Sequence, residues 1–291
     1  MPEAERKKID MGYLYQMKAR GEKVSWLTAY DYPMALFEDK AGIEMIMPGD
    51  SGMMALLGHR NTLSATMEQM LWMTQAVARA VKYAFLIGDM PYMSYQTSKE
   101  EAIRNAGRFM AEGGVDCVKM EGGVDVADTL AAVVKAGVPV MGHIGMTPQS
   151  AAVIGGYRSQ GRTESVARKI IEDARRLQDA GAWSIVVEAV PAKVAGLIVE
   201  AVDIPIYGIG AGPMVDGQVL IVHDMLGLFE LFKPKFVRRY AQLGQAMMEA
   251  FQHYKDDVKA NTFPGPDECY NMPEDEYQKL VAGLKSRPLS H

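Results

Sequence analysis

The sequence predicts a (β/α)8 barrel, and three features lead to that prediction. Eight short apolar runs of strand length recur along the chain. Amphipathic helical patterns separate them over about 250 residues, the usual size of this fold. Polar side chains stand at the end of each run, where barrel enzymes place their chemistry. A doubly wound sheet has the same alternation and is the competing architecture, but the number of runs favours the barrel.

The predicted strands are rich in Val, Ile and Met, and turn residues border many of them. They occupy residues 24–30, 43–49, 83–89, 117–121, 138–144, 183–189, 204–210 and 218–224. Helix starts are marked by Thr66 with Gln69 and by Ser98 with Glu101, both capping-box patterns. A long helix is expected over residues 234–259, where apolar side chains recur on one side.

Domain organisation follows from the same pattern. Residues 1–264 are expected to form the barrel, with a capping helix before the first strand. Residues 265–291 are rich in proline and acid at their start, and are expected to be a tail lying over the surface or a partner subunit, not a separate domain.

Composition excludes several classes of protein. The 291 residues carry a net charge of −5, which argues against binding to nucleic acid or an anionic membrane. Two cysteines, Cys117 and Cys269, are too few for a disulfide framework and fit a reducing compartment. The charged N-terminus lacks the apolar core of a secretion signal, and no apolar run approaches the ~18 residues of a membrane span. A cytoplasmic protein is expected.

Carboxylates at three strand ends predict a metal site. Asp50 follows the second strand, Asp89 ends the third and Glu121 ends the fourth. Acids that converge in one barrel mouth repel each other unless a cation lies among them. All-oxygen ligands suit Mg²⁺, with Mn²⁺ as the alternative, and Glu121 is the acid expected to act from the second sphere. The competing interpretation is that any one of these acids caps a loop.

Three further polar residues are candidates for substrate chemistry. Lys119 lies two residues before Glu121, so both point into the barrel, and a substrate carboxylate is its expected partner. An ion pair with Glu121 alone is the alternative. Glu188 ends an apolar run, where a raised pKa suits a general base. His143 is expected to position other groups rather than to act as a catalyst.

Several long motifs resemble the ketopantoate hydroxymethyltransferase family. They occur in the family's order between Lys8 and Pro264: "LTAYDYPMA", "GDS", "DMPYMSYQ", "VKMEGG", "PVMGHIGMTPQS", "GGYRSQGR", "VVEAVPA", "IGIGAGPMVDGQVLIVHDMLG" and "PKFVRRYA". The resemblance implies a barrel of the phosphoenolpyruvate/pyruvate superfamily. It also implies transfer of a hydroxymethyl group from 5,10-methylenetetrahydrofolate to 3-methyl-2-oxobutanoate, giving 2-dehydropantoate for pantothenate biosynthesis.

The resemblance also implies site residues and partners. Mg²⁺ and the folate are the expected cofactor and co-substrate, and a homo-oligomer, commonly a decamer, is the expected assembly. The family's metal ligands fall on Asp50 and Asp89, with Glu121 completing or supporting them. Its proton acceptor falls on Glu188. Its substrate contacts fall on Ser51, Asp89 and Lys119, and we also expect Asp50 and His143 to contact the substrate.

Residues 48–64 depart most from the family pattern, notably at Pro48, Gly52 and Met53. These changes lie beside Asp50 and Ser51, so they are expected to weaken the preference for 3-methyl-2-oxobutanoate over other 2-oxo acids. Two alternatives remain open. One is a superfamily lyase or mutase, or a hydroxymethyltransferase for another 2-oxo acid, although the lyase motif Lys-Lys-Cys-Gly-His is missing. The other is a non-catalytic barrel that binds a 2-oxo acid.

Overall fold

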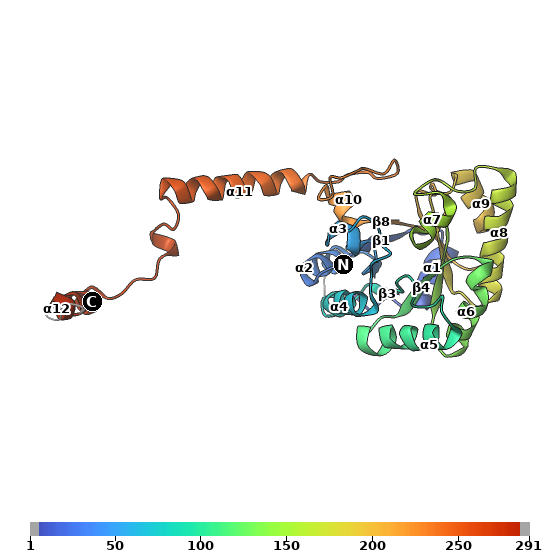
Figure 1. The fold of residues 1–291 in the computed structure, drawn as a ribbon, viewed down its shortest axis with the longest axis horizontal. Helices are drawn as coiled ribbons and strands as arrows, with labels where there is room; N and C mark the ends of the chain where they lie inside the picture. Colours follow the sequence, from blue (N-terminus) through green and yellow to red (C-terminus); the bar gives the residue numbers. More distant parts are fainter. Residues whose placement is uncertain (1–5, 286–291) are drawn as a thin grey trace. The chain divides into compact units, whose positions relative to one another are not determined.

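Eight parallel strands close into a barrel in the order of the chain, which confirms the predicted fold (Figure 1). The computed structural model describes residues 6–285. The strands are β1 (Val24–Thr28), β2 (Met45–Met47), β3 (Phe85–Asp89), β4 (Cys117–Glu121), β5 (Val140–Gly145), β6 (Ser184–Glu188), β7 (Ile206–Ile209) and β8 (Gly217–Leu220). No helix of the described residues is long and apolar enough to cross a membrane.

Helices follow the strands and cover the outside of the barrel (Figure 1). The outer helices are α2 (Tyr32–Ala41), α4 (Met67–Ala78), α5 (Lys99–Arg108) with a π-helical turn η2 (Phe109–Gly113), α6 (Val124–Lys135), α8 (Glu164–Asp179), α9 (Ala192–Ala201) and α10 (Val222–Leu226). Short helices α3 (Gly52–Ala55), η3 (Pro148–Ser150) and α7 (Ala151–Ile154) lie in the loops that follow β2 and β5. The capping box at Thr66 and Gln69 is present at the start of α4.

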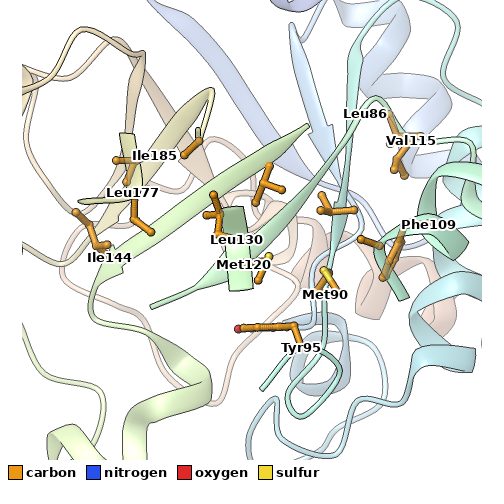
Figure 2. Packing of buried hydrophobic residues seen from close by; sticks show 14 of the residues in the cluster. Leu86, Met90, Tyr95, Phe109, Val115, Met120, Leu130, Ile144, Leu177 and Ile185 are labelled. Carbon is orange, nitrogen blue, oxygen red and sulfur yellow. The ribbon is translucent and has the colours of Figure 1, made fainter. Parts of the chain in front are cut away.

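Two apolar clusters hold the barrel together. The larger one fills the layer between strands and helices, where Leu86, Phe109 and Val115 pack side by side (Figure 2). Gly88 makes this packing possible, because a Cβ atom there would lie 2.7 Å from the Phe109 ring. The smaller cluster fills the barrel interior and includes Leu14 of the N-terminal helix α1 (Met11–Ala19).

The interior rows of β3 and β4 place polar groups at the barrel mouth. Side chains alternate along a strand, so Asp89 continues the inward row begun by Phe85 and Ile87. On β4 the inward row runs from Cys117 through Lys119 to the last residue of the strand. The apolar part of each row packs the barrel interior, and the polar part faces the open end.

The structure differs from two predicted elements. The eighth strand ends at Leu220, and His223 and Asp224 belong to α10 rather than to a strand end. The helix predicted from residue 234 begins at Leu243, as α11 (Leu243–Ala260). Residues 234–241 are irregular because they cover the barrel: Val237 is buried, and Phe236 packs on Gly210, where a Cβ atom would lie 2.6 Å from its ring.

The chain divides into two compact units, one ending at Ala241 and the other beginning at Gln242. The second unit contains α11, the turn η4 (Pro266–Glu268) and α12 (Glu274–Lys285). None of the described side chains of α11 or α12 is buried. The predicted boundary at residue 264 and the assignment of residues 265–291 as a tail stay predictions.

Glu38 is a buried acid with no hydrogen-bond partner for either carboxylate oxygen in the described part of the chain. Burial, with a contribution from Asp31, raises the pKa of Glu38 from 4.5 to about 9. The folded state therefore keeps this proton between those values while the unfolded state loses it, so stability falls as pH rises through this window. Glu38→Gln stays neutral and is expected to stabilise the fold by about 2–4 kcal/mol at about pH 8, and little near about pH 5. Thermal melting at both pH values tests this, and equal pH slopes for the two proteins would contradict it.

Candidate active site

The seven site residues predicted from the sequence all line one cavity at the mouth of the barrel. Its volume is about 450 Å³, and its walls are mainly apolar. The predicted residues are Asp50, Ser51, Asp89, Lys119, Glu121, His143 and Glu188. Residues from five strand ends thus meet in a single space, although their roles stay predictions.

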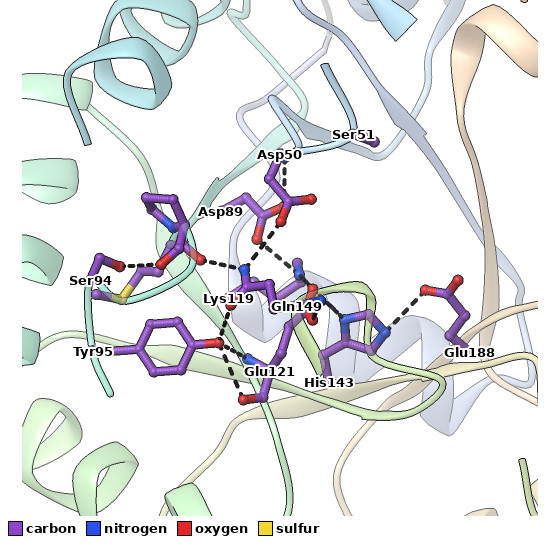
Figure 3. Close-up of polar contacts among 12 residues, drawn as sticks. Asp50, Ser51, Asp89, Ser94, Tyr95, Lys119, Glu121, His143, Gln149 and Glu188 are labelled. Atoms are coloured by element: carbon purple, nitrogen blue, oxygen red, sulfur yellow. Dashed lines mark hydrogen bonds and ion pairs between the residues drawn. The ribbon is translucent and has the colours of Figure 1, made fainter. Parts of the chain in front are cut away.

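Asp50 and Asp89 lie next to each other on the loop after β2 and the end of β3 (Figure 3). The backbone N–H of Asp50 donates to Asp89 Oδ2 at 3.0 Å. Both residues are buried: only 4% of the surface of Asp50 and 1% of the surface of Asp89 is exposed. Burial and the neighbouring Asp89 and Glu121 carboxylates raise the pKa of Asp50 well above its ordinary value. The pair is a concentration of negative charge that attracts a cation.

Lys119 already has two acidic partners. Its Nζ lies 2.8 Å from Asp89 Oδ1 and 3.1 Å from Glu121 Oε1. Asp89 and Lys119 are register partners on β3 and β4, so the fold itself sets this contact. Burial acts to lower the pKa of Lys119, but Asp89 and Glu121 outweigh it and raise that pKa well above its ordinary value. The lysine therefore stays charged, and its ion pair is shared between Asp89 and Glu121 rather than made with Glu121 alone. A substrate carboxylate as a further partner stays a prediction.

His143 bridges two carboxylates. Its Nδ1 lies 3.3 Å from Glu121 Oε1, and its Nε2 lies 3.2 Å from Glu188 Oε2 (Figure 3). Burial and Lys119 act to lower the pKa of His143, but Glu121 and Glu188 outweigh them and raise it to about 9. Glu188 was expected in an apolar setting, and instead it faces this imidazolium. The pairing comes from different strands, β5 and β6, so sequence neighbours do not reveal it.

Glu121 is fully engaged by protein groups. Besides Lys119 and His143, it accepts a 3.0 Å hydrogen bond at Oε2 from the backbone N–H of Gln149. Burial acts to raise the pKa of Glu121, but the two cations and the hydrogen bonds lower it to about 2. This carboxylate is thus held ionised without any metal.

The residues fit a divalent cation held by two acids. Oδ1 of Asp50 accepts no hydrogen bond within the described residues, whereas Oδ2 accepts one from Gln149 at 3.1 Å. Mg²⁺ takes one or two carboxylates and keeps other positions open. In residues 6–285 no group of three His, Cys, Asp or Glu side chains is arranged to hold a metal ion. With every group in its charged form, the four acids Asp50, Asp89, Glu121 and Glu188 exceed the two cations Lys119 and His143 by two negative charges.

Gln149 and Tyr95 are site residues that the sequence reasoning missed. Gln149, on η3, is buried and donates through Nε2 to Asp50 and to the Met90 carbonyl, the latter at 2.9 Å. Its Oε1 accepts a 2.7 Å hydrogen bond from Tyr95, whose hydroxyl also accepts from the backbone N–H of Glu121. Both residues lie within the family motifs quoted above, but polar residues in loops carry no strand-end signal.

Gln149→Ala tests the role of this link between the Asp50 and Glu121 sides of the site. The substitution removes the hydrogen bond to Asp50 Oδ2, so the carboxylate loses its orientation. Loss of such supporting contacts typically weakens metal affinity by about 10–100-fold. We expect that loss in a titration of Mg²⁺ binding. Gln96→Ala is the matched control, because in residues 6–285 the Gln96 side chain hydrogen-bonds only to Gln149 Oε1 and the adjacent Tyr95 backbone. Equal affinity in the two variants would contradict the role of Gln149.

Ser51 lies beside a tyrosine rather than in the acid cluster. Its Oγ is 2.8 Å from the hydroxyl of Tyr30, which accepts a 3.0 Å hydrogen bond from Thr28. Burial raises the pKa of Tyr30, so the phenol stays protonated. The Ser51 hydroxyl is thereby oriented at the cavity wall.

Comparisons with known proteins show which family the chain belongs to. A family model described as ketopantoate hydroxymethyltransferase matches residues 8–266. The chain belongs to this family. A member from Syntrophobacter fumaroxidans, named 3-methyl-2-oxobutanoate hydroxymethyltransferase, is 52% identical over 91% of this chain and 94% of the relative. A member of the same name from Moorella thermoacetica is 48% identical over 92% of this chain and 99% of the relative.

Solved structures show how widely this family's barrel is shared. Phosphonopyruvate hydrolase, in a complex with oxalate and Mg²⁺, aligns with a TM-score of 0.60 at 12% identity, covering 97% of this chain and 100% of that one. For 2,3-dimethylmalate lyase, described as a PEP mutase/isocitrate lyase superfamily member, the TM-score is 0.58 at 16% identity, with 95% of each chain covered. At these identities the likeness establishes the fold alone.

Proposed function

We propose that this chain transfers a hydroxymethyl group from 5,10-methylenetetrahydrofolate to 3-methyl-2-oxobutanoate, giving 2-dehydropantoate for pantothenate biosynthesis. The observation that carries the proposal is the meeting of Asp50, Asp89, Lys119 and Glu188 in one cavity of a chain that belongs to the ketopantoate hydroxymethyltransferase family. Paired acids, a buried lysine and a partly exposed glutamate supply a metal site, a charge for the substrate and a base.

Mg²⁺, with Mn²⁺ as the alternative, fits Asp50 and Asp89. Glu121 supports the site from the second sphere, since its two oxygens already contact Lys119, His143 and the Gln149 backbone. When bound, the cation polarises the keto group of a 2-oxo acid and favours the enolate, an effect worth several kcal/mol.

The chain's own residues bind the acid and move its proton. Lys119 and Ser51 are proposed to hold the substrate carboxylate. The side chain of Glu188 is 13% exposed and lines the cavity, which suits a group that must reach the C3 proton of the substrate. His143 keeps the Glu188 carboxylate in place through the 3.2 Å contact. The enolate carbon C3 would then form a bond to the methylene carbon of the folate, and water would replace the folate nitrogen on that carbon, giving the hydroxymethyl product and tetrahydrofolate.

Substrate preference is proposed to follow the residues that line the cavity, which do not include the altered positions Gly52 and Met53. Met53 is fully buried in the core, and a Cβ atom at Gly52 would lie 2.8 Å from the Tyr30 ring, so neither lines the cavity. Trp26 and Val186 of the strands do line it, together with Met54, Ala55 and Thr62 of the loop. We therefore propose that 3-methyl-2-oxobutanoate stays preferred, in place of the weakened preference expected from the sequence.

A panel assay tests the function and the preference together. The measurement is kcat/KM for 3-methyl-2-oxobutanoate, 2-oxobutanoate and 3-methyl-2-oxopentanoate with methylenetetrahydrofolate and Mg²⁺. One methylene in an apolar pocket is typically worth about 10–200-fold, so the first acid is expected to lead by a factor in that range. Equal values would reject the proposed preference, and no product with any of the three would reject the proposed reaction.

We also propose a homo-oligomer, a decamer by family resemblance. The helix α11 carries exposed apolar side chains along its length, which suit a second copy of the chain. They are Leu243, Met247, Phe251, Tyr254 and Val258. Sedimentation velocity of the full chain measures the assembly, and a monomer at micromolar concentration would reject it.

Both cysteines are free, which supports a cytoplasmic location.

A further inference from the structure

The buried and the exposed charged side chains around the cavity differ in sign. The acid cluster, with Lys119 and His143, is buried at the bottom. Among the described lining residues, the two exposed charged side chains are both cations, Arg158 and Lys235. The outer part of the cavity therefore presents positive charge, in contrast to the excess of negative charge below it.

These two cations have no anionic partner in the part of the chain that the structure describes. Every ion pair at the site involves other residues, and the Arg158 and Lys235 side chains form no hydrogen bond in residues 6–285. A cation held at a cavity mouth without a partner is available to an anionic ligand.

The segments that carry these cations are fastened to the barrel. After Arg158, the backbone N–H of Gln160 donates to the carbonyl of Ala189 at 3.0 Å. After Lys235, Val237 is buried, and the backbone N–H of Tyr240 donates to the carbonyl of Met225 at 2.8 Å. Both charges thus stand on anchored loops, which lowers the entropy lost when a ligand binds.

The cavity lining also includes exposed aromatic side chains that neighbour the two cations in sequence. Tyr157, Phe232 and Phe236 line the same cavity and are 50%, 51% and 37% exposed. The volume of about 450 Å³ falls in the range of about 300–1,000 Å³ that suits ligands much larger than a five-carbon acid. The outer cavity therefore has room for a flat, partly apolar second ligand with an anionic end.

We propose that Arg158 and Lys235 bind the glutamate tail of the folate co-substrate, and that the enzyme therefore favours polyglutamylated folate. This inference rests on the proposed function. Each added glutamate contributes a carboxylate, and guanidinium and ammonium groups both pair with carboxylates. The 2-oxo acid does not compete for this place, because its carboxylate is assigned to the buried Lys119 and the metal site.

The test compares folates that differ only in their tails. KM is measured for 5,10-methylenetetrahydrofolate with one and with three glutamates, using the Mg²⁺-loaded wild type and the double variant Arg158→Gln/Lys235→Gln. The matched control is Arg162→Gln/Lys233→Gln, which removes two exposed cations nearby that do not line the cavity. Deuterium exchange at C3 of 3-methyl-2-oxobutanoate without folate reports separately on the acid site.

The wild type and the control are expected to show a lower KM for the triglutamate. The double variant is expected to raise that KM by about 3–10-fold, the range for two partly exposed ion pairs, and to change the monoglutamate KM less. Added salt should weaken the wild-type preference. An unchanged triglutamate KM in the double variant, or an equal rise in the control, would overturn the inference. Absence of both C3 exchange and transfer in the wild type would instead reject the proposed function.

Discussion

Replacing Asp89 by asparagine is expected to lower turnover by about 10³-fold while the fold persists. The amide has the shape of the carboxylate but not its charge, so the site loses half of its proposed metal-binding pair. A bound metal typically stabilises the transition state by several kcal/mol. Each loss of about 1.4 kcal/mol slows the reaction about tenfold, which gives the expected decrease. The amide oxygen still accepts the hydrogen bond from the Asp50 backbone, and Lys119 keeps Glu121 as a partner. The fold should therefore survive.

The measurements are turnover and Mg²⁺ affinity, with circular dichroism to monitor the fold. Asp224→Asn is the matched control, because Asp224 is also a buried acid lining the cavity but takes no part in the acid cluster. We expect this control to keep most of its activity and its metal affinity. Near-normal turnover of Asp89→Asn at low micromolar Mg²⁺ would show that Asp89 is not a ligand.

Glu188→Gln is expected to stop proton removal without preventing substrate binding. A general base typically contributes about 10²–10⁴-fold in rate, so exchange of the C3 proton should fall by that factor. The amide retains an oxygen toward His143 Nε2, which limits the rearrangement around the substituted side chain. Asp50, Asp89 and Lys119 are untouched, so binding of the metal and of the 2-oxo acid should remain.

Deuterium exchange at C3 of 3-methyl-2-oxobutanoate, followed by NMR, measures this step without folate. Glu188→Asp serves as the matched variant, since it keeps the carboxylate but withdraws it by one methylene. It should exchange faster than Glu188→Gln and more slowly than the wild type. If Glu188→Gln exchanges at the wild-type rate, another group removes the proton.

The strand-end pattern was sufficient to predict which residues meet at the barrel mouth, although their roles stay predictions. Strand periodicity alone puts Asp89, Lys119 and Glu121 on inward rows, and parallel strands bring those rows to one end of the barrel. The contact between His143 and Glu188 was not predictable in this way, because it depends on the register between the neighbouring strands β5 and β6. For the same reason Glu188 was expected among apolar neighbours and instead lies beside a cation.

The positions and contacts of loop residues were harder to predict from the sequence. Gln149 is a buried residue of the short turn η3, and the neighbouring sequence does not indicate that its side-chain amide reaches Asp50. Residues 234–241 carry helix-like spacing, yet they pack across the barrel because burying Val237 and seating Phe236 on Gly210 outweigh local helix formation. Tertiary contacts, which the sequence pattern does not contain, decided both cases.

The most direct test of the proposed reaction follows both half-reactions in one NMR tube. Wild-type protein is mixed in deuterium oxide with 3-methyl-2-oxobutanoate, then with Mg²⁺, and finally with 5,10-methylenetetrahydrofolate. We expect C3 exchange to begin when the metal is added, and 2-dehydropantoate to form when the folate is added. An equal rate of C3 exchange with and without Mg²⁺, or the absence of hydroxymethyl product after the folate is added, would contradict the proposed function.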